Sequence, residues 1–428
     1  MFSLLSFLMT ALSQEPAKPA DAPQETVFKS LVKQVSLDGQ IRLRYEYRSP
    51  ADYVNAVAST RADDVFLERV RLNLKFLATD DIEIFIQPQD ERHWGQEPGV
   101  VADTQNLDLH QGFFEVRNLL GEPLSIKGGR MELSYGDQRL VSPLDWSNVA
   151  RAWDGAKIRW SPADWWIEGF FTRIKEGVGQ AENNDFFGLY GSYVGVPDHE
   201  FDLYAFKRTL RNNTTTDEEG NVGNLMDLTV GARVKGKGMG FDYTVEVMDQ
   251  TGSFVTDRIT AYGYAGTLGY TFEMPWTPRL GVEYTFASGD RRPGDSKHNT
   301  FDPLFPFGHY FQGFADEFAF KNGKDAAVYL KGVPATGVSV NVDLHNFWLA
   351  RDKDAWYNSG GAAVRRDVTG AATDRVGQEL DVTTRIAAGK YVKFWAGWSH
   401  FFTGPYVSQT PGQDQDMNWY FVQMTVDF

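Results

Sequence analysis

Apolar and polar residues alternate one by one along most of this chain. Residues 41–48 place Ile, Leu, Tyr and Tyr on one side of an extended strand and Arg, Arg, Glu and Arg on the other. The same period of two runs through residues 70–76, 228–235, 241–247 and 338–344. Because successive side chains of a β-strand point to opposite faces, this pattern predicts strands with one apolar and one polar face. We therefore expect an all-β protein.

The connections between these segments alternate in length. Eight short ones carry Gly, Pro or Asp in most cases, as tight turns do. They lie at residues 79–81, 121–123, 161–164, 195–199, 236–240, 274–278, 332–337 and 388–390. Longer polar stretches separate them, such as residues 50–64, 211–224, 289–307 and 351–376. Eight turns join sixteen strands in pairs, and one more strand at each end of the series brings the expected number to 18.

Short turns on one side and long loops on the other are typical of an outer-membrane protein. We expect a transmembrane antiparallel up-and-down β-barrel with short periplasmic turns and long extracellular loops. A soluble sandwich or propeller gives no reason for the turn lengths to alternate, and no blade motif recurs. No apolar run reaches the roughly 18 residues that a spanning helix needs.

The first residues have a different composition from the rest. Residues 1–13 (MFSLLSFLMTALS) form the longest continuous apolar stretch and end in a small-x-small pattern, which predicts a secretory signal peptide. It is atypical because no Lys or Arg precedes the apolar run, and a buried helix start is the alternative. Residues 14–35 are expected to form a flexible, Pro/Ala-rich periplasmic spacer. Residues 36–428 would then form a single barrel domain.

Composition excludes several functions. The chain has 42 Lys and Arg against 57 Asp and Glu, a net charge of −15, which argues against a nucleic-acid partner. It has no Cys, which removes disulfides, thiolate zinc sites and cysteine nucleophiles. Its 7 His residues show no catalytic spacing, and no Gly-rich phosphate loop is present. We expect no enzyme, no cofactor and no metal site, since loop carboxylates such as Asp352 and Asp354 suit a solvated loop better than calcium.

The end of the sequence alternates as well. Residues 420–428 are apolar at every second position and finish on Phe428. This segment resembles the terminal-Phe signal by which the barrel-assembly machinery recognises its clients. The last strand must also close against the first, because an open sheet edge is not tolerated in lipid.

The polar faces of the first strands are rich in cations. If the apolar faces meet lipid, the polar faces line the lumen, and they carry Arg42, Arg44, Arg69, Arg71 and Arg159. Acidic residues on neighbouring strands offer one interpretation, a network that stiffens the wall. The other is a path for an anionic solute, because the planar guanidinium binds carboxylate in a bidentate manner and stays charged.

Charged residues are densest in residues 129–160, GRMELSYGDQRLVSPLDWSNVARAWDGAKIRW. Gly136 and Pro143 interrupt this stretch, which predicts a strand leading into a structured loop that folds over or into the pore. The pattern GGR-x-ELSYGDQRLV-x-PLDWSN-x-x-R-x-WDGA resembles the alginate-export family of outer-membrane porins. The likeness extends more weakly from Val35 to Phe428.

This resemblance implies a monomeric 18-stranded barrel in a Gram-negative-type outer membrane. Its function would be the passive export of an anionic, alginate-like polyuronate through an Arg-rich constriction, with outer-membrane lipid and possible periplasmic export proteins as further partners. Arg130, Asp137, Arg139 and Arg151 carry over from the motif as constriction or loop-anchoring residues. The alternatives are a porin for small anionic or neutral solutes, and a non-conducting receptor or enzyme.

Overall fold

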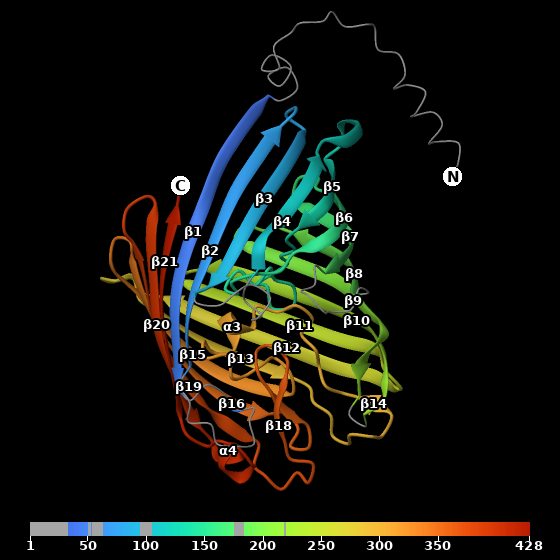
Figure 1. Ribbon diagram of the computed structural model, residues 1–428, viewed down its shortest axis with the longest axis vertical. Helices are drawn as coiled ribbons and strands as arrows, with labels where there is room; N and C mark the ends of the chain where they lie inside the picture. Colours follow the sequence, from blue (N-terminus) through green and yellow to red (C-terminus); the bar gives the residue numbers. More distant parts are fainter. Residues whose placement is uncertain (1–32, 50–52, 54–62, 95–104, 175–183, 218–219) are drawn as a thin grey trace, which may run out of the picture.

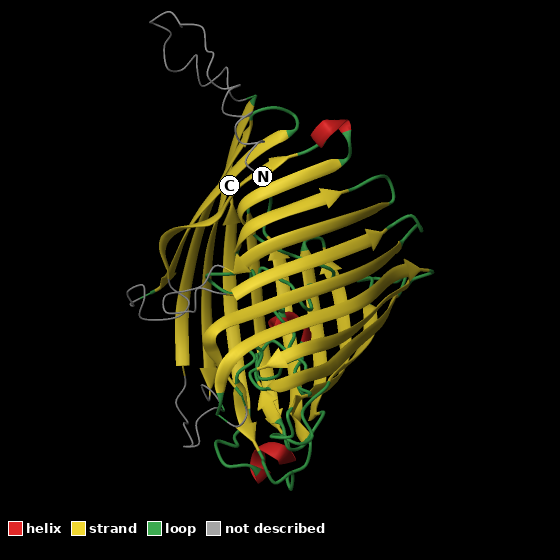
Figure 2. Cartoon of the chain, turned by 90° about the vertical axis from the view of Figure 1, so that its right-hand side faces the viewer, coloured by secondary structure: helices red, strands yellow, loops and turns green. Residues whose placement is uncertain are grey.

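The computed structural model describes residues 33–49, 53, 63–94, 105–174, 184–217 and 220–428. Within them, one sheet of 19 strands closes on itself (Figures 1 and 2). The two-residue strand β14 (Lys297–His298) is parallel to β12, and the other 18 strands form the antiparallel wall of a barrel. The first half of the wall consists of β1 (Gln34–Ser49), β2 (Asp63–Leu77), β3 (Ile82–His93), β4 (Gln105–Val116), β5 (Leu124–Met131), β6 (Trp153–Trp160), β7 (Trp165–Ile174), β8 (Asn184–Tyr193) and β9 (His199–Thr216). The second half consists of β10 (Val222–Gly238), β11 (Phe241–Phe254), β12 (Asp257–Thr271), β13 (Arg279–Ala287), β15 (Gly323–Ala335), β16 (Val338–Leu349), β19 (Arg375–Ala387), β20 (Val392–Thr403) and β21 (Met417–Asp427). The predicted barrel of 18 strands is confirmed.

The barrel closes where β1 meets β21. The two strands pair from Gln40 opposite Asp427 to Ser49 opposite Asn418. Beyond this register, Gly39 and Phe428 exchange two backbone hydrogen bonds of 2.9 and 3.0 Å. A Cβ atom at Gly39 would lie 2.6 Å from the Phe428 ring and 2.7 Å from the carbonyl oxygen of Arg71. Glycine at this position lets the last ring lie flat against the closing seam.

The apolar and polar residues that alternate in the sequence point alternately to the outer and inner faces of the barrel wall. On β1 the side chains of Arg42 and Arg44 are buried inside the barrel, whereas Ile41 and Tyr45 are exposed on its outer face. Exposed apolar side chains continue around the outside, as on β12 with Tyr262 and others. This arrangement is what lipid requires, because the outer face contacts acyl chains and the backbone groups are satisfied between strands.

The eight predicted short connections all lie at one end of the barrel, together with the start of β1 and the end of β21 (Figure 1). This is the periplasmic end, and one of the connections contains the short helix η1 (Leu119–Gly121). The long connections lie at the opposite, extracellular end. The predicted alternation of turn lengths is therefore confirmed.

Two predicted boundaries differ in detail or cannot be followed. Residues 211–224, expected as a loop, belong mostly to β9 and β10, whose last pair is Thr216 with Val222. Beyond the bilayer, backbone hydrogen bonds alone can extend a hairpin that is polar on both faces. The predicted signal peptide and residues 14–32 of the predicted spacer lie outside the described residues, and β1 begins at Gln34.

Two long connections run into the barrel instead of leaving it. One is residues 132–152, between β5 and β6, and the other is residues 288–322, which contains α3 (Gly308–Phe311). A parallel bridge joins Val141 to Phe305, so that the two segments are held together (Figure 2, where α3 lies within the ring of strands). They pack against inward-facing aromatic side chains of the wall such as Phe206. The interior is therefore partly apolar, in addition to the charged side chains that strand alternation predicted for the lumen.

A second apolar cluster lies toward the extracellular end. It joins the hairpin of β17 (Ala355–Tyr357) and β18 (Ala363–Arg366) to α4 (Pro405–Gln409) and to Tyr53. Within the described residues, no helix combines the length and the apolar character needed to cross a bilayer.

Candidate functional site

Four arginines project into the lumen from the two strands at the closing seam. Arg42 and Arg44 come from β1, and Arg69 and Arg71 come from β2. Arg42 lies directly opposite Arg69 in the register, and all four side chains are buried. Like charges opposite each other destabilise a sheet, so this arginine ladder needs compensating groups.

Residues 132–152 supply these groups. Arg42 donates to the carbonyl oxygens of Asp145 and Ser147 at 2.6 and 3.0 Å. Arg69 also donates to the Asp145 carbonyl, at 3.1 Å, and its guanidinium lies 2.9 Å from the Asp145 carboxylate. Arg71 reaches the same carboxylate oxygen at 2.8 Å. One loop residue thus receives three arginines, through its backbone and its side chain.

The arginine ladder keeps Asp145 ionised. Burial by itself would raise the pKa of this carboxyl group, but the nearby guanidinium groups of Arg69, Arg71 and Arg42 outweigh it and lower the pKa below the usual range. The carboxylate therefore holds its ion pairs throughout the physiological pH range.

Trp146 connects the arginine ladder to the second inward segment. The Arg44 guanidinium lies over its ring and donates to its carbonyl oxygen at 2.6 Å. On the other side the ring stacks on His309, with centroids 4.1 Å apart, and meets Trp395 and Phe421 edge-on at 5.1 Å. Both inward segments are therefore anchored at one aromatic residue.

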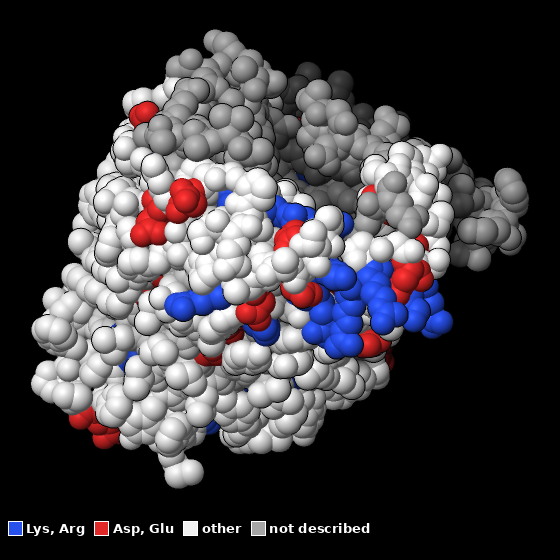
Figure 3. All heavy atoms as spheres, turned by 90° about the horizontal axis from the view of Figure 1, so that it is seen from below, with Lys and Arg blue, Asp and Glu red and all other residues white. Residues whose placement is uncertain are grey.

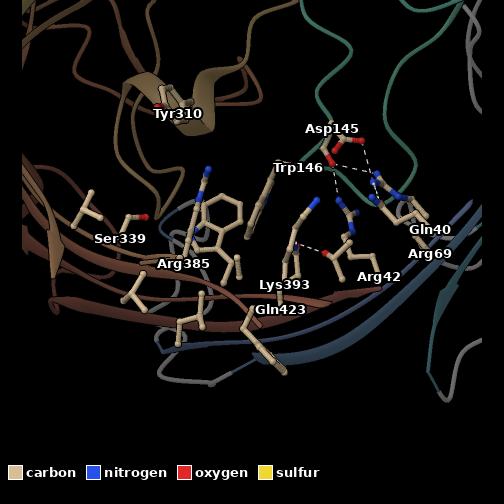
Figure 4. A pocket seen from close by; sticks show the side chains of 18 of the residues that line it. Gln40, Arg42, Arg69, Asp145, Trp146, Tyr310, Ser339, Arg385, Lys393 and Gln423 are labelled. Atoms are coloured by element: carbon tan, nitrogen blue, oxygen red, sulfur yellow. Dashed lines mark hydrogen bonds and ion pairs between the residues drawn. The ribbon is translucent and has the colours of Figure 1, made fainter. Parts of the chain in front are cut away.

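A cavity of about 680 Å³ extends from the arginine ladder to the periplasmic turns (Figure 4). Its wall carries the cationic side chains of Arg42, Arg69, Arg385 and Lys393 against the single carboxylate of Asp145. Trp146, Phe307, Tyr310, Phe394 and Trp395 supply aromatic surface. We call this space the periplasmic cavity. Its chemistry suits a solute that combines negative charge with apolar ring faces.

Two of these cations were not predicted from the sequence. Arg385 on β19 lies with its guanidinium carbon 4.1 Å from the centre of the Trp395 ring, and no ion pair involves it within the described residues. Lys393 on β20 pairs with Asp427 at 2.6 Å. The alternation of Asp381, Thr383 and Arg385 on β19 would have identified Arg385 as facing inward.

A second cavity of about 490 Å³ adjoins the first and shares Tyr310, Ser339 and Arg385 with it. It contains Asp137 and Arg139 from residues 132–152. Its remaining charged lining residues are Lys235, Arg279, Glu283, Lys331 and Asp343. Counting the shared Arg385, its lining has five cationic side chains and three carboxylates, a smaller excess of positive charge than in the periplasmic cavity.

A third cavity, of about 370 Å³, lies toward the extracellular end and shares no lining residue with the other two. Leu225 and Ile259 of the central apolar cluster line it. Phe320 of the same cluster lies 5.9 Å from the guanidinium carbon of Arg139, beside the second cavity. Packed apolar side chains of one cluster therefore lie beside both the second and the third cavity.

The predicted site residues fall into three groups. Arg42, Arg44, Arg69 and Arg71 come together around residues 145–147, as described above. Asp137 and Arg139 lie farther along the lumen: Asp137 pairs with Lys235 at 2.7 Å, and Arg139 pairs with Glu283 at 2.9 Å. Arg151 donates to the carbonyl oxygen of Pro306 at 2.9 Å and so joins the two inward segments.

The remaining two lie apart from these groups. Arg130 is on the outer face, where it forms a bidentate pair with Asp154 at 2.7 and 2.9 Å. Its neighbour Met131 faces the interior cluster, so strand alternation points Arg130 outward. Arg159 faces inward at the periplasmic end, over the Trp166 ring at 3.7 Å. Arg130 is thus not in the lumen, contrary to the expectation from the motif.

The described residues contain no group of three or more His, Asp or Glu side chains placed to hold a metal ion.

The sequence model of the Alginate export family matches residues 33–421, nearly the whole chain. The chain belongs to the Alginate export family. As the family and the fold indicate, this protein is an outer-membrane β-barrel channel. No curated protein matches it.

Solved structures agree with the fold. The barrel resembles OccK11 (OpdR) of Pseudomonas aeruginosa, with a TM-score of 0.61, 11% identity and coverage of 93% of this chain and 97% of that one. OpdO of the same organism gives a TM-score of 0.62 with 11% identity, covering 94% and 99%. Its outer membrane protein OprD gives 0.59 with 10% identity, covering 92% and 93%. At this identity the likeness of this chain to these structures concerns the fold alone.

Proposed function

We propose that this channel passes an anionic, alginate-like polyuronate outward through its lumen. The observation that carries the proposal is the charge of the periplasmic cavity, which has four cationic side chains and one carboxylate in a chain of net charge −15. The excess of carboxylates therefore lies outside this cavity. Cationic linings are the usual device for anion selectivity in pores.

The aromatic side chains in the same cavity support a carbohydrate. The side chain of Trp146 lies between Arg385 and Lys393 (Figure 4), and Trp395 and Tyr310 line the same cavity. Sugar rings have apolar faces that pack on aromatic rings, and uronate carboxylates match the guanidinium fork of Arg385 or Arg42. A polyuronate presents both features at every unit.

The two inward segments would control whether the channel is open or closed. Residues 132–152 and 288–322 occupy the lumen, where Arg44 of the wall donates to the carbonyl oxygen of Trp146 and Gln250 of the wall donates to that of Asp302, at 3.0 Å. A polymer could pass only if these segments move aside. We propose that the anchoring at Trp146 and Arg151 keeps the channel closed until the polymer competes for the arginines.

Planar-bilayer recording tests the proposal. Sodium alginate added at micromolar concentration to the periplasmic side should block the current and the block should weaken in Arg385→Gln. Arg130→Gln is the matched control, because it removes the same charge on the outer face. Absence of any block, with no difference between the two variants, would refute a polyuronate path.

The second candidate is a channel for small anionic or neutral solutes. It is favoured by the packed apolar side chains beside the cavities, such as Leu225, Ile259 and Phe320, because they narrow the space left for a polymer. Liposome swelling distinguishes the two: rapid entry of mono- and disaccharides without block by alginate would support the small-solute channel. We infer that neither case involves catalysis.

Three partner assignments belong to the same proposal. Phe428, at the closing seam, would be recognised by the barrel-assembly machinery before the barrel forms. Periplasmic export proteins would deliver the polymer to the short-turn end. The barrel would act as a monomer in outer-membrane lipid.

A further inference from the structure

Four cationic side chains gather at the extracellular rim of the barrel. They are Arg258 at the start of β12 and Arg291, Arg292 and Lys297 in the segment that leads into β14. All four are exposed. Within the described part of the chain, none of these side chains has a hydrogen bond or an ion pair. We call these four residues the rim cluster.

Backbone pairing holds the rim cluster together. β14 runs parallel to β12 and places Lys297 opposite Arg258, whose N–H donates to the carbonyl oxygen of Ser296 at 3.1 Å. A turn closed by the N–H of Asp295 on the carbonyl of Arg292, at 3.2 Å, connects the arginine pair to Lys297. Seen from the extracellular end, Lys and Arg side chains gather toward one side of the molecule (Figure 3).

Carboxylates in this region do not cancel the charge. Asp257 and Asp290 are buried. Asp290 accepts the backbone N–H groups of Arg292 and Asn299 at 2.8 and 3.2 Å. Asp295 is the exposed carboxylate of the turn itself. The rim cluster therefore presents more positive than negative charge to its surroundings.

The rim cluster lies above an aromatic patch on the lipid-facing surface. Arg258 shares its register on β12 with the exposed rings of Tyr262 and Tyr264. Phe286 of β13 stacks on both, with centroids 5.5 and 5.2 Å away, and Tyr284 lies beside Tyr264. Aromatic rings at this position mark the membrane–water interface, where the acyl chains end and the headgroups begin. Arg258 lies four residues farther out, roughly 13 Å along the strand.

We propose that the rim cluster binds the phosphate groups of a phosphorylated glycolipid in the outer leaflet. Guanidinium groups hold phosphate oxygens in a bidentate manner, and Arg258 faces lipid and not the lumen. The acyl chains of the same molecule would lie against the aromatic patch of Tyr262, Tyr264, Tyr284 and Phe286. This site is separate from the path in the lumen, and it needs no transported solute.

The test uses the full-length, detergent-solubilised barrel and a bisphosphorylated glucosamine disaccharide lipid as the probe. Binding is measured by native mass spectrometry for the wild type and for the triple variant Arg291→Gln, Arg292→Gln, Lys297→Gln. The matched control removes three exposed lysines near the periplasmic end, Lys33→Gln, Lys237→Gln and Lys390→Gln. Each surface cation contributes about a factor of five, so the rim variant should bind roughly 100-fold more weakly, with the control unchanged.

Two further probes make the result decisive. The dephosphorylated form of the same lipid should bind the wild type as weakly as the phosphorylated lipid binds the rim variant. Equal binding of the two lipids, or an equal loss in both variants, would overturn the proposal. If the rim variant instead loses the block of current by sodium alginate and keeps the lipid, the rim cluster belongs to the polymer path. The conductance of the rim variant is measured as well. If it equals that of the wild type, a loss of lipid binding concerns the rim cluster alone and says nothing against the transport proposal.

Discussion

The guanidinium carbon of Arg44 lies 3.9 Å from the centre of the Trp146 ring, and the same guanidinium donates to the Trp146 carbonyl oxygen. One strand side chain therefore holds both the ring and the backbone of a single residue in the inward segment. His309 stacks on the opposite face of this ring, so the contact also fixes the second segment. The position of both segments in the lumen depends on this small group of side chains.

Removing the ring should release the inward segments. We expect Trp146→Ala to raise the single-channel conductance and to make residues 132–152 sensitive to protease, because a contact between a cation and an aromatic ring contributes about 0.5–2 kcal/mol and the stacked neighbours are lost with it. Arg159→Ala is the control, since it removes a similar contact with Trp166 at a site away from these segments. Equal conductance in Trp146→Ala and the wild type would show that the segments are held by other contacts.

Charge selectivity should respond with opposite signs to two substitutions in the periplasmic cavity. Arg385→Gln removes a cation without an ion pair and should lower the preference for anions. Asp145→Asn removes the one carboxylate that the described residues contribute to that wall, and it should raise the preference for anions. Reversal potentials in a salt gradient measure both effects. Shifts of the same sign would mean that the ions do not pass through this cavity.

Two arginines of the sequence motif should differ in their effect on stability. Arg139→Ala leaves Glu283 buried without its partner, which costs about 3–5 kcal/mol. Arg130→Ala breaks a pair on the outer face, which contributes about 0–1 kcal/mol. The free energy of unfolding is measured in denaturant, with the folded fraction read from the different gel mobilities of folded and heat-denatured barrel. Arg139→Ala should lose more of it than Arg130→Ala. A similar loss in both would contradict the placement of Arg130 outside the lumen.

The effect of the Asp145 carboxylate on charge selectivity should persist in mild acid. Its pKa is lowered, so the ionised form and its ion pairs are present above the ordinary Asp value near 3.9 and are lost only as the pH falls through the lower folded-state value. The difference in reversal potential between the wild type and Asp145→Asn should therefore stay constant from pH 7 to about pH 4. A difference that disappears by pH 5 would show that the arginines do not hold this carboxylate.

Most of the wall could be predicted from the sequence because lipid imposes a strict rule on every spanning strand. Residues 41–48 show it fully, since each outward side chain is apolar and each inward one is charged. The same rule would have placed Arg130 correctly. Leu124 and Ile126 on β5 have the same parity as Arg130, which marks that side of the strand as the outer face.

The interior could not be predicted in this way. Phe206 and Tyr190 face inward although the lumen of a barrel is expected to be polar, because residues 132–152 cover them. The course of that segment depends on single contacts such as Arg44 with Trp146, and it leaves no periodic pattern in the sequence. The carbonyl groups of this segment accept hydrogen bonds from the arginine ladder. Because every residue has a backbone carbonyl, the sequence does not reveal which residues accept them.

The closing seam has a consequence for when this protein can fold. The pairs between β1 and β21 join residues separated by nearly the whole chain, and only they remove the last open edge of the sheet. During synthesis and secretion every shorter length of the chain therefore keeps unpaired strand edges, which invite pairing with other chains. The sheet can therefore close only once the final strand is present, and the edge of β1 stays open until then.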